Sequence, residues 1–259
     1  MIKTIFIRQD DVRTNEVNGF EIGAVIVYPD KPRAMFNKCL VDIGFRGAKE
    51  NLSVVEALNY YKSVIRYCKE PYLVIPDNNQ RYSVYSDKLA KFIKYVRENK
   101  FTGDITWVLP IHGTDVTTLY NAVYWDVKDL GYNVMFGLPS HEATIAGKYD
   151  YFKLIDCSKN FEACININYH KMVLVRQVIP RAEFHIMGCT MAQFATYHKS
   201  KQFDGVISVD TMSYRLAPSN RDKENGKYMC TDNCWDWFIK WLDRALNREI
   251  IQPSPLLFL

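Results

Sequence analysis

The chain of 259 residues lacks an apolar run long enough to cross a membrane, which takes about 18 residues or more. It also lacks a strong excess of one charge. A formal net charge of +4 excludes a histone-like polycation but permits a local basic surface for phosphate contact. The opening stretch, MIKTIFIRQDDVRTNEV, has too short an apolar segment and is too acidic afterwards for a signal peptide. We therefore expect a cytoplasmic protein with no membrane partner.

Ordered cysteine motifs are also missing. The seven cysteines are scattered, and in a cytoplasmic chain we expect most of them to be reduced and buried. Cys230 and Cys234 form a C-x3-C pair with no histidine after it. Since a closed structural zinc site needs four ligands, the sequence predicts no metal. We expect no cofactor.

The residues that are present predict a barrel. Hydrophobic residues make up 48% and charged residues 24%, which is typical of a soluble globular domain. From residue 38 onward, strand-like runs alternate with amphipathic helical segments. The expected strands are 38–45, 72–76, 105–111, 133–138, 152–156, 183–187 and 205–210. The expected helices are 54–67, 87–99, 114–130, 168–178, 191–201 and 234–246. This alternation demands a parallel sheet covered by helices, and seven or eight units favour a closed (β/α)8 barrel of the TIM type over an open doubly wound sheet.

The first 37 residues differ from the rest. FEIGAVIVYPDKPR alternates like a strand and ends in a proline-rich turn, which predicts a small N-terminal β hairpin or cap. No internal repeat, linker or low-complexity tract divides the chain. We expect a single domain over residues 1–259, with the cap at 1–37 and the barrel at 38–259.

In such a barrel, functional residues gather at the carboxyl ends of the strands. The predicted strand ends carry Asp42, Asp77, His112, Gly113, Gly137, Leu138, Glu142, the segment 185–188 and Asp210. Several carboxylates at one mouth suit nucleophilic and acid–base chemistry on a polar ring or a sugar. The alternative is that each aspartate only caps the helix that follows it.

Four segments carry a family resemblance. VLPIHG (108–113), FGLPSHEA (136–143), FHIMGCTMAQF (184–194) and FDGVISVDTMSYRLAP (203–218) follow one another in that order. They resemble successive strand-end motifs of tRNA-guanine transglycosylases and their DNA-modifying relatives. The family patterns are V-Q-G, G-G-L-x-x-G-E, Y-L-M-G-V-G and F-D-C-V-x-P-T-R. The resemblance spans residues 40 to 218.

The resemblance implies roles for individual residues. Asp210 takes the place of the nucleophile, which forms a covalent glycosyl-enzyme that an incoming base then displaces with retention of configuration. Asp42 is similar to the family's second aspartate, an acid or base for the purines, and Asp77 to the carboxylate that binds the purine edge. The resemblance places the rest of the base pocket at His112, Gly113, Gly137, Leu138, Glu142, Met187 and Gly188. Gly137 and Leu138 are expected to offer backbone amides to the base.

The chain departs from the family in four places. His112 replaces a glutamine and His141 a glycine, while the D-S-G-G segment around Asp42 is reduced to Asp42-Ile43-Gly44-Phe45. The zinc run C-x-C-x-x-C, part of the appendage that helps hold tRNA in the family, is missing. Its absence favours DNA, as in the phage DpdA-like enzymes that insert 7-deazaguanines such as preQ0.

After Asp210, a basic and aromatic segment offers stacking and phosphate contacts, or else is a solvated charged loop. Its candidate contacts are Tyr214, Arg215, Arg221 and Lys223.

Three alternatives remain. A tRNA-guanine transglycosylase keeps the chemistry and changes the nucleic acid. A non-catalytic nucleic-acid-binding barrel subunit would be expected to lose the nucleophile, so the presence of Asp210 together with Asp77 and Glu142 argues against it. An aldolase, isomerase or phosphosugar barrel would need a strand-end lysine or a glycine-rich phosphate loop, and the sequence offers neither.

Overall fold

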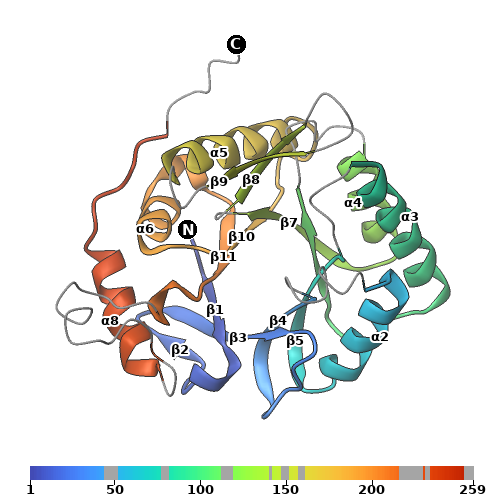
Figure 1. Cartoon of the computed structure of the whole chain (residues 1–259), viewed down its shortest axis with the longest axis horizontal. Coiled ribbons are helices and arrows are strands. Elements are labelled where there is room, and N and C mark those ends of the chain that lie inside the picture. The colour runs from blue at the N-terminus through green and yellow to red at the C-terminus, as the bar shows by residue number, and fades with distance from the viewer. Residues whose placement is uncertain are drawn as a thin grey trace.

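The computed structural model describes residues 1–43, 52–76, 82–111, 119–139, 142–146, 152–156, 161–215, 230 and 234–253. Within these residues, eight parallel strands form a closed ring (Figure 1). The ring strands are β1 (Thr4–Arg8), β3 (Phe20–Val27), β4 (Phe36–Asp42), β5 (Cys68–Val74), β6 (Thr106–Pro110), β7 (Asn133–Pro139), β10 (Phe184–Met187) and β11 (Val206–Asp210). Their order is β1-β11-β10-β7-β6-β5-β4-β3, and the pairing of β1 with β3 closes the ring. The predicted TIM-type barrel is confirmed.

Helices surround the ring (Figure 1). They are α2 (Val54–Ile65), α3 (Tyr82–Glu98), α4 (Leu119–Asp129), α5 (Phe161–Val178), α6 (Met191–Lys199) and α8 (Trp235–Leu246), with short 3-10 turns η1 (Gln9–Asp11), η2 (Lys201–Phe203) and η3 (Ser213–Arg215). Capping boxes begin two of them, at Ser53 with Glu56 and at Thr190 with Gln193. None of the helices in the described ranges is long and apolar enough to cross a membrane.

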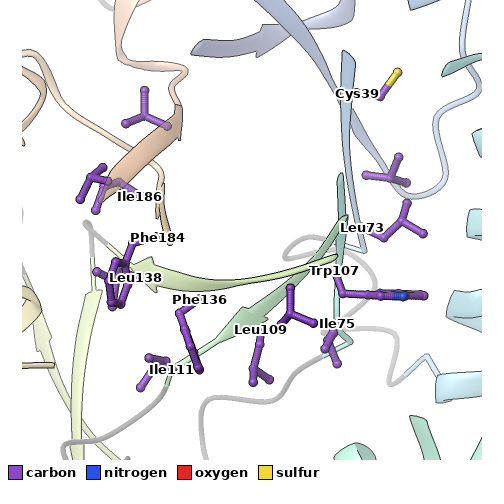
Figure 2. Packing of buried hydrophobic residues seen from close by; sticks show 14 of the residues in the cluster. Cys39, Leu73, Ile75, Trp107, Leu109, Ile111, Phe136, Leu138, Phe184 and Ile186 are labelled. Atoms are coloured by element: carbon purple, nitrogen blue, oxygen red, sulfur yellow. The ribbon is translucent and has the colours of Figure 1, made fainter. Parts of the chain in front are cut away.

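Alternation along the strands separates two apolar layers. Figure 2 shows one set of side chains pointing out of the ring, among them Leu73, Trp107 and Phe136, where they pack under the helices. The alternate residues fill the barrel interior with a smaller cluster of Phe6, Leu40, Val74, Val108 and Met135. The alternation of side chains that predicted the strands therefore also determines which residues contact the helices and which fill the barrel interior.

An ion-pair group lies at the amino ends of three neighbouring strands. Lys38 Nζ is 2.8 Å from Glu21 Oε2 and 3.2 Å from Glu70 Oε2, and Thr4 Oγ1 donates to the same Glu21 oxygen. Burial acts to lower the pKa of Lys38, but its hydrogen bonds to Glu21 and Glu70 and the charge interactions with its neighbours together outweigh burial and raise the pKa. These contacts connect the amino ends of β3, β4 and β5.

The boundary predicted at residue 38 is wrong, because two ring strands precede it. β1 pairs with β11 on one side and β3 on the other. A hairpin does lie in the first 37 residues: β2 (Glu16–Val17) runs antiparallel to β3 outside the ring. Its turn residues Asn18 and Gly19 both have positive φ, as a tight hairpin turn requires. The hairpin is therefore an extension of a barrel strand, with no separate cap.

The run 152–156 is a strand, although it does not belong to the barrel. β9 (Phe152–Asp156) pairs antiparallel with β8 (Glu142–Ala146) in a separate two-stranded sheet. Only five residues connect the two strands, too few for the crossover that parallel neighbours need. The hairpin is inserted between β7 and α5, and β1 and β3 supply the strands that complete the ring.

Candidate functional site

Asp210 ends β11 at the carboxyl end of the barrel, with its side chain 18% exposed. Its Oδ1 accepts a hydrogen bond from the Gly188 N–H at 3.0 Å and lies 3.0 Å from His185 Nε2. No hydrogen bond reaches Oδ2 from the residues that the structure describes. The carboxylate is therefore held through Oδ1, and Oδ2 has no hydrogen-bond donor among the described residues.

His185 continues this contact into the barrel interior. Its side chain is fully buried, its Nδ1 lies 2.9 Å from Ser208 Oγ, and Ser208 Oγ lies 3.7 Å from Met135 Sδ. On β10, His185 and Met187 share a face, and on β11 so do Ser208 and Asp210, because strand side chains alternate. Neighbouring strands β10 and β11 therefore bring His185, Ser208 and Asp210 together.

The ends of β10 and β11 are also joined through their backbones. Cys189 N–H donates to the Asp210 carbonyl at 2.7 Å, and Thr211 Oγ1 donates to the Cys189 carbonyl at 2.6 Å. Gly188 has φ +73°, a left-handed conformation that glycine adopts without strain, and this turn carries the N–H that donates to Asp210. Burial, and then the charge of Asp210, raise the pKa of the Cys189 thiol. Cys189 is therefore held as a neutral packing residue.

Asp42 ends β4 at the same end of the barrel. In the ring order, β1 and β3 lie between β11 and β4, so Asp42 and Asp210 belong to one mouth without being strand neighbours. The Asp42 carbonyl accepts from the Tyr28 N–H at 2.9 Å. Burial raises the pKa of Tyr60, and the charges of Asp30 and Asp42 raise it further. The role of Asp42 as acid or base stays a prediction.

The space beside Gly137, where a base is expected to approach, is occupied by the Met187 side chain. A Cβ at Gly137 would lie 2.8 Å from Met187 Sδ and 3.1 Å from Val108 Cγ1, so Met187 fills that space. The Gly137 carbonyl accepts from Ile111 N–H, and the residue pairs with Pro110 and His185 in the sheet. Leu138 points outward and is fully buried under the helices (Figure 2). Glycine at 137 accommodates barrel packing, and the expected contact of the Gly137 and Leu138 amides with a base stays a prediction.

Several predicted residues are not placed with their side chains. Asp77, His112, Gly113, His141, Arg221 and Lys223 lie outside the described residues. Glu142 is described through its backbone, opposite Asp156 in the β8–β9 hairpin. Their assigned roles remain predictions.

Tyr214 and Arg215 are not surface contacts for nucleic acid. Both are buried, and both bind the fully buried Asp11: Tyr214 Oη donates to Oδ2 at 2.5 Å, Arg215 Nε to Oδ2 at 2.9 Å and Arg215 Nη2 to Oδ1 at 3.1 Å. Cys234 N–H donates to Oδ1 as well. Burial acts to raise the pKa of Asp11, but these hydrogen bonds outweigh it and lower the pKa. The donors that sequence reasoning assigned to phosphates are used inside the protein.

Exposed positive charge near the mouth lies elsewhere. Arg8 ends β1, and Arg33 precedes β4; their side chains are 40% and 74% exposed. Both contact Asp10, at 3.2 Å from Arg8 Nε and 2.9 Å from Arg33 Nη1. Two guanidinium groups share one carboxylate, so this group of three side chains carries a net positive charge.

The cysteines differ in part from the expectation. Cys39, Cys68 and Cys189 are free and buried, as expected of small apolar residues. Cys230 and Cys234, however, are joined by a disulfide, so as placed they do not offer thiolates to a metal. No group of three or more His, Cys, Asp or Glu side chains that could hold a metal occurs in the described part of the chain.

The sequence pointed to the 185–188 strand end, but it did not single out His185 or Ser208 as neighbours of Asp210. In FHIM and VISVD, side chains alternate between the two faces of each strand, and this pattern could have indicated that His185, Ser208 and Asp210 share a face.

Comparisons with protein-family models, curated proteins and solved structures found no match to this chain.

Proposed function

We propose that this barrel is a transglycosylase that exchanges guanine in a nucleic acid for a 7-deazaguanine base. One observation supports it most directly. Asp210 lies at the carboxyl end of a barrel strand with Oδ1 bound by two groups and Oδ2 without a hydrogen bond from the described residues. A carboxylate fixed in this way is suited to attack a sugar carbon, because orientation and charge are both in place before reaction.

The proposed reaction has two displacements. Asp210 Oδ2 attacks the anomeric carbon, the bond to guanine breaks, and the electron pair leaves on the base, which takes up a proton. A nitrogen of the incoming base then attacks the same carbon, loses its proton, and releases Asp210. Two inversions retain the sugar configuration. Asp42 is proposed to donate and accept these protons. Asp77 is proposed to bind the edge of the purine.

The proposed nucleic acid is DNA in preference to tRNA, on the sequence ground that the zinc motif is missing. A base in a duplex must be turned out into the pocket or met in a single strand. Arg8 and Arg33 are the described candidates for the flanking phosphates, in place of the buried Arg215.

The test is parallel incubation of DNA and tRNA, each labelled in guanine, with the enzyme and a 7-deazaguanine. Release of label from DNA that depends on the added base supports the proposal. Release from tRNA alone moves the substrate to tRNA. No release from either, with binding retained, favours the non-catalytic barrel subunit.

Phosphate contact has its own test. Replacing Arg8 and Arg33 with alanine is expected to weaken nucleic-acid binding and to reduce the dependence of log K on log salt by roughly one per lost phosphate contact, because fewer counterions are released. Arg97→Ala on α3, where the arginine pairs with Asp126, is the control and should not change the slope. An unchanged slope in the double variant would remove the two arginines from the interface.

A further inference from the structure

The surroundings of His185 determine which of its nitrogens carries a proton. An ionised carboxylate only accepts hydrogen bonds, so a bond between His185 Nε2 and Asp210 Oδ1 requires hydrogen on Nε2. In a neutral ring, Nδ1 is then an acceptor, and Ser208 Oγ at 2.9 Å can donate to it. Ser208 therefore matches the ring form that donates to Asp210.

Met135 accommodates the other ring state. When both nitrogens carry hydrogen, Nδ1 donates to Ser208 Oγ, and the hydroxyl hydrogen needs a new acceptor. Met135 Sδ lies 3.7 Å from Ser208 Oγ and is a weak acceptor. Rotation of one hydroxyl satisfies both states, so the bond from Nε2 to Asp210 persists in each.

Packing fixes the ring itself. His185 is fully buried, and its ring lies edge-on to Phe6 at 5.9 Å between centroids. The Phe6 ring in turn occupies the space where a side chain at residue 23 would stand: a Cβ on Gly23 would overlap it. The groups facing His185 from β1 and β7 are the uncharged Phe6 and Met135, and Asp210 on β11 is the one described charged group bonded to it.

We propose that His185 is a positioning residue that commits Asp210 Oδ1 to hydrogen bonding and so makes Oδ2 the reacting oxygen, with Ser208 and Met135 keeping Nε2 protonated in both ring states. The catalytic consequence rests on the proposed function, whereas the hydrogen-bond arrangement does not. Gly188 N–H supplies the second donor to Oδ1. Two donors on one oxygen orient the carboxylate before the substrate arrives.

The arrangement is tested without substrate. Nitrogen-15 NMR of the five histidines at pH 8, with His185→Gln to identify the resonance, is expected to show hydrogen on Nε2 and a bare Nδ1 for His185. Hydrogen on Nδ1 with a bare Nε2 would overturn the proposal. The ring state is measured on the unmodified protein, and His185→Gln serves only to assign the resonance.

The consequence is tested by base exchange. His185→Leu removes the donor and is expected to lower kcat about a hundredfold with KM for the base unchanged, as loss of one oriented donor does. His185→Gln places an amide N–H near the position of Nε2 and should stay within about tenfold of wild type. Ser63→Ala, on the exposed face of α2, is the matched control for Ser208→Ala, which should lower kcat while Ser63→Ala does not.

Outcomes separate the two proposals. Nε2 protonation with no exchange by wild type on any nucleic acid would sink the transglycosylase function and leave the positioning arrangement standing. If wild type exchanges bases and His185→Leu keeps the full kcat, the positioning role is overturned and the function stands. The same holds if the activity that His185→Leu loses is accounted for by a higher KM. Circular dichroism establishes that each variant compared is folded.

Discussion

At the residue scale, Asp210 and Asp11 show how neighbours decide what a carboxylate does. Asp11 is fully buried and both its oxygens accept hydrogen bonds from Tyr214, Arg215 and Cys234. Asp210 is partly exposed and uses one oxygen. A carboxylate with both oxygens used is a structural anchor, whereas one with a spare oxygen at a barrel mouth is suited to reaction.

Asp210→Asn keeps the shape of the side chain and removes its charge and nucleophilic oxygen. Base exchange is expected to fall by several orders of magnitude, because covalent nucleophiles act together with their supporting groups, while base binding changes little. Wild-type enzyme given nucleic acid without an incoming base should form a denaturation-resistant adduct on gels, and the variant should not. Near-normal exchange by the variant would show that Asp210 is not the nucleophile, and Asp42 would be tested next.

Lys171 gives a prediction about stability. Its side chain is fully buried on α5, its Nζ donates to the Ile111 carbonyl at 3.0 Å, and burial lowers its pKa from 10.5 to about 7. Between these two values the unfolded chain holds a proton that the folded chain lacks. The free energy of unfolding should therefore rise with pH by about 1.4 kcal/mol per unit in this window, relative to Lys171→Met.

Denaturant titrations of both proteins at pH 7, 8 and 9 measure this difference. Below pH 7 both states hold the proton, and the difference should level off. Lys91→Met, which changes an exposed lysine on α3, is the control and should follow wild type. A wild-type-minus-Lys171→Met difference that does not change from pH 7 to 9 would contradict the lowered pKa.

At the element scale, Asp11 connects three segments that are far apart in sequence. It belongs to η1, it binds Tyr214 and Arg215 of η3, and it accepts from the N–H of Cys234 just before α8. η1 follows β1 and η3 follows β11, so the contact ties the ends of two adjacent ring strands to the helix that covers them.

Asp11→Ala is expected to lower the free energy of unfolding by about 3–5 kcal/mol, because it leaves a buried arginine without its counter-charge. Thermal and denaturant unfolding measure this loss. Asp87→Ala, which breaks an exposed pair with Lys91, is the control and should cost under about 1 kcal/mol. A similar small loss for both variants would mean that Arg215 finds another partner or solvent.

The fold was predictable from sequence where it depends on local patterns, and it was not where it depends on distant contacts. Alternation and length predicted six ring strands and placed Asp210 at the end of one of them, because these are local properties of a chain in a barrel. Asp11, the partner of Tyr214 and Arg215, lies more than 200 residues away in sequence, and no local sequence pattern predicts this contact. β1 was missed because its buried run, Ile5 to Ile7, is short and is followed by acidic residues that resemble a surface segment. β9 has strand periodicity, but periodicity alone does not say which sheet a strand joins.

At the scale of the whole molecule, the prediction concerns metal. Purified protein is expected to contain far less than one zinc per chain by elemental analysis, and a chelator should leave its circular dichroism unchanged, since a closed zinc site needs four ligands. The disulfide between Cys230 and Cys234 engages both sulfurs of the expected C-x3-C pair. Stoichiometric zinc bound by these cysteines would contradict the prediction and make tRNA the leading substrate.

The way the ring closes has a consequence for how the protein is made. β1 is translated about 200 residues before β11, yet Thr4 is registered with Ser208 and Phe6 with Asp210. Until β11 has left the ribosome, β1 and β10 each present an unpaired strand edge, a template for association with other chains. Such distant pairing also slows folding. The strand that closes the barrel carries the proposed nucleophile, so a nascent chain gains its ring and its site in the same event.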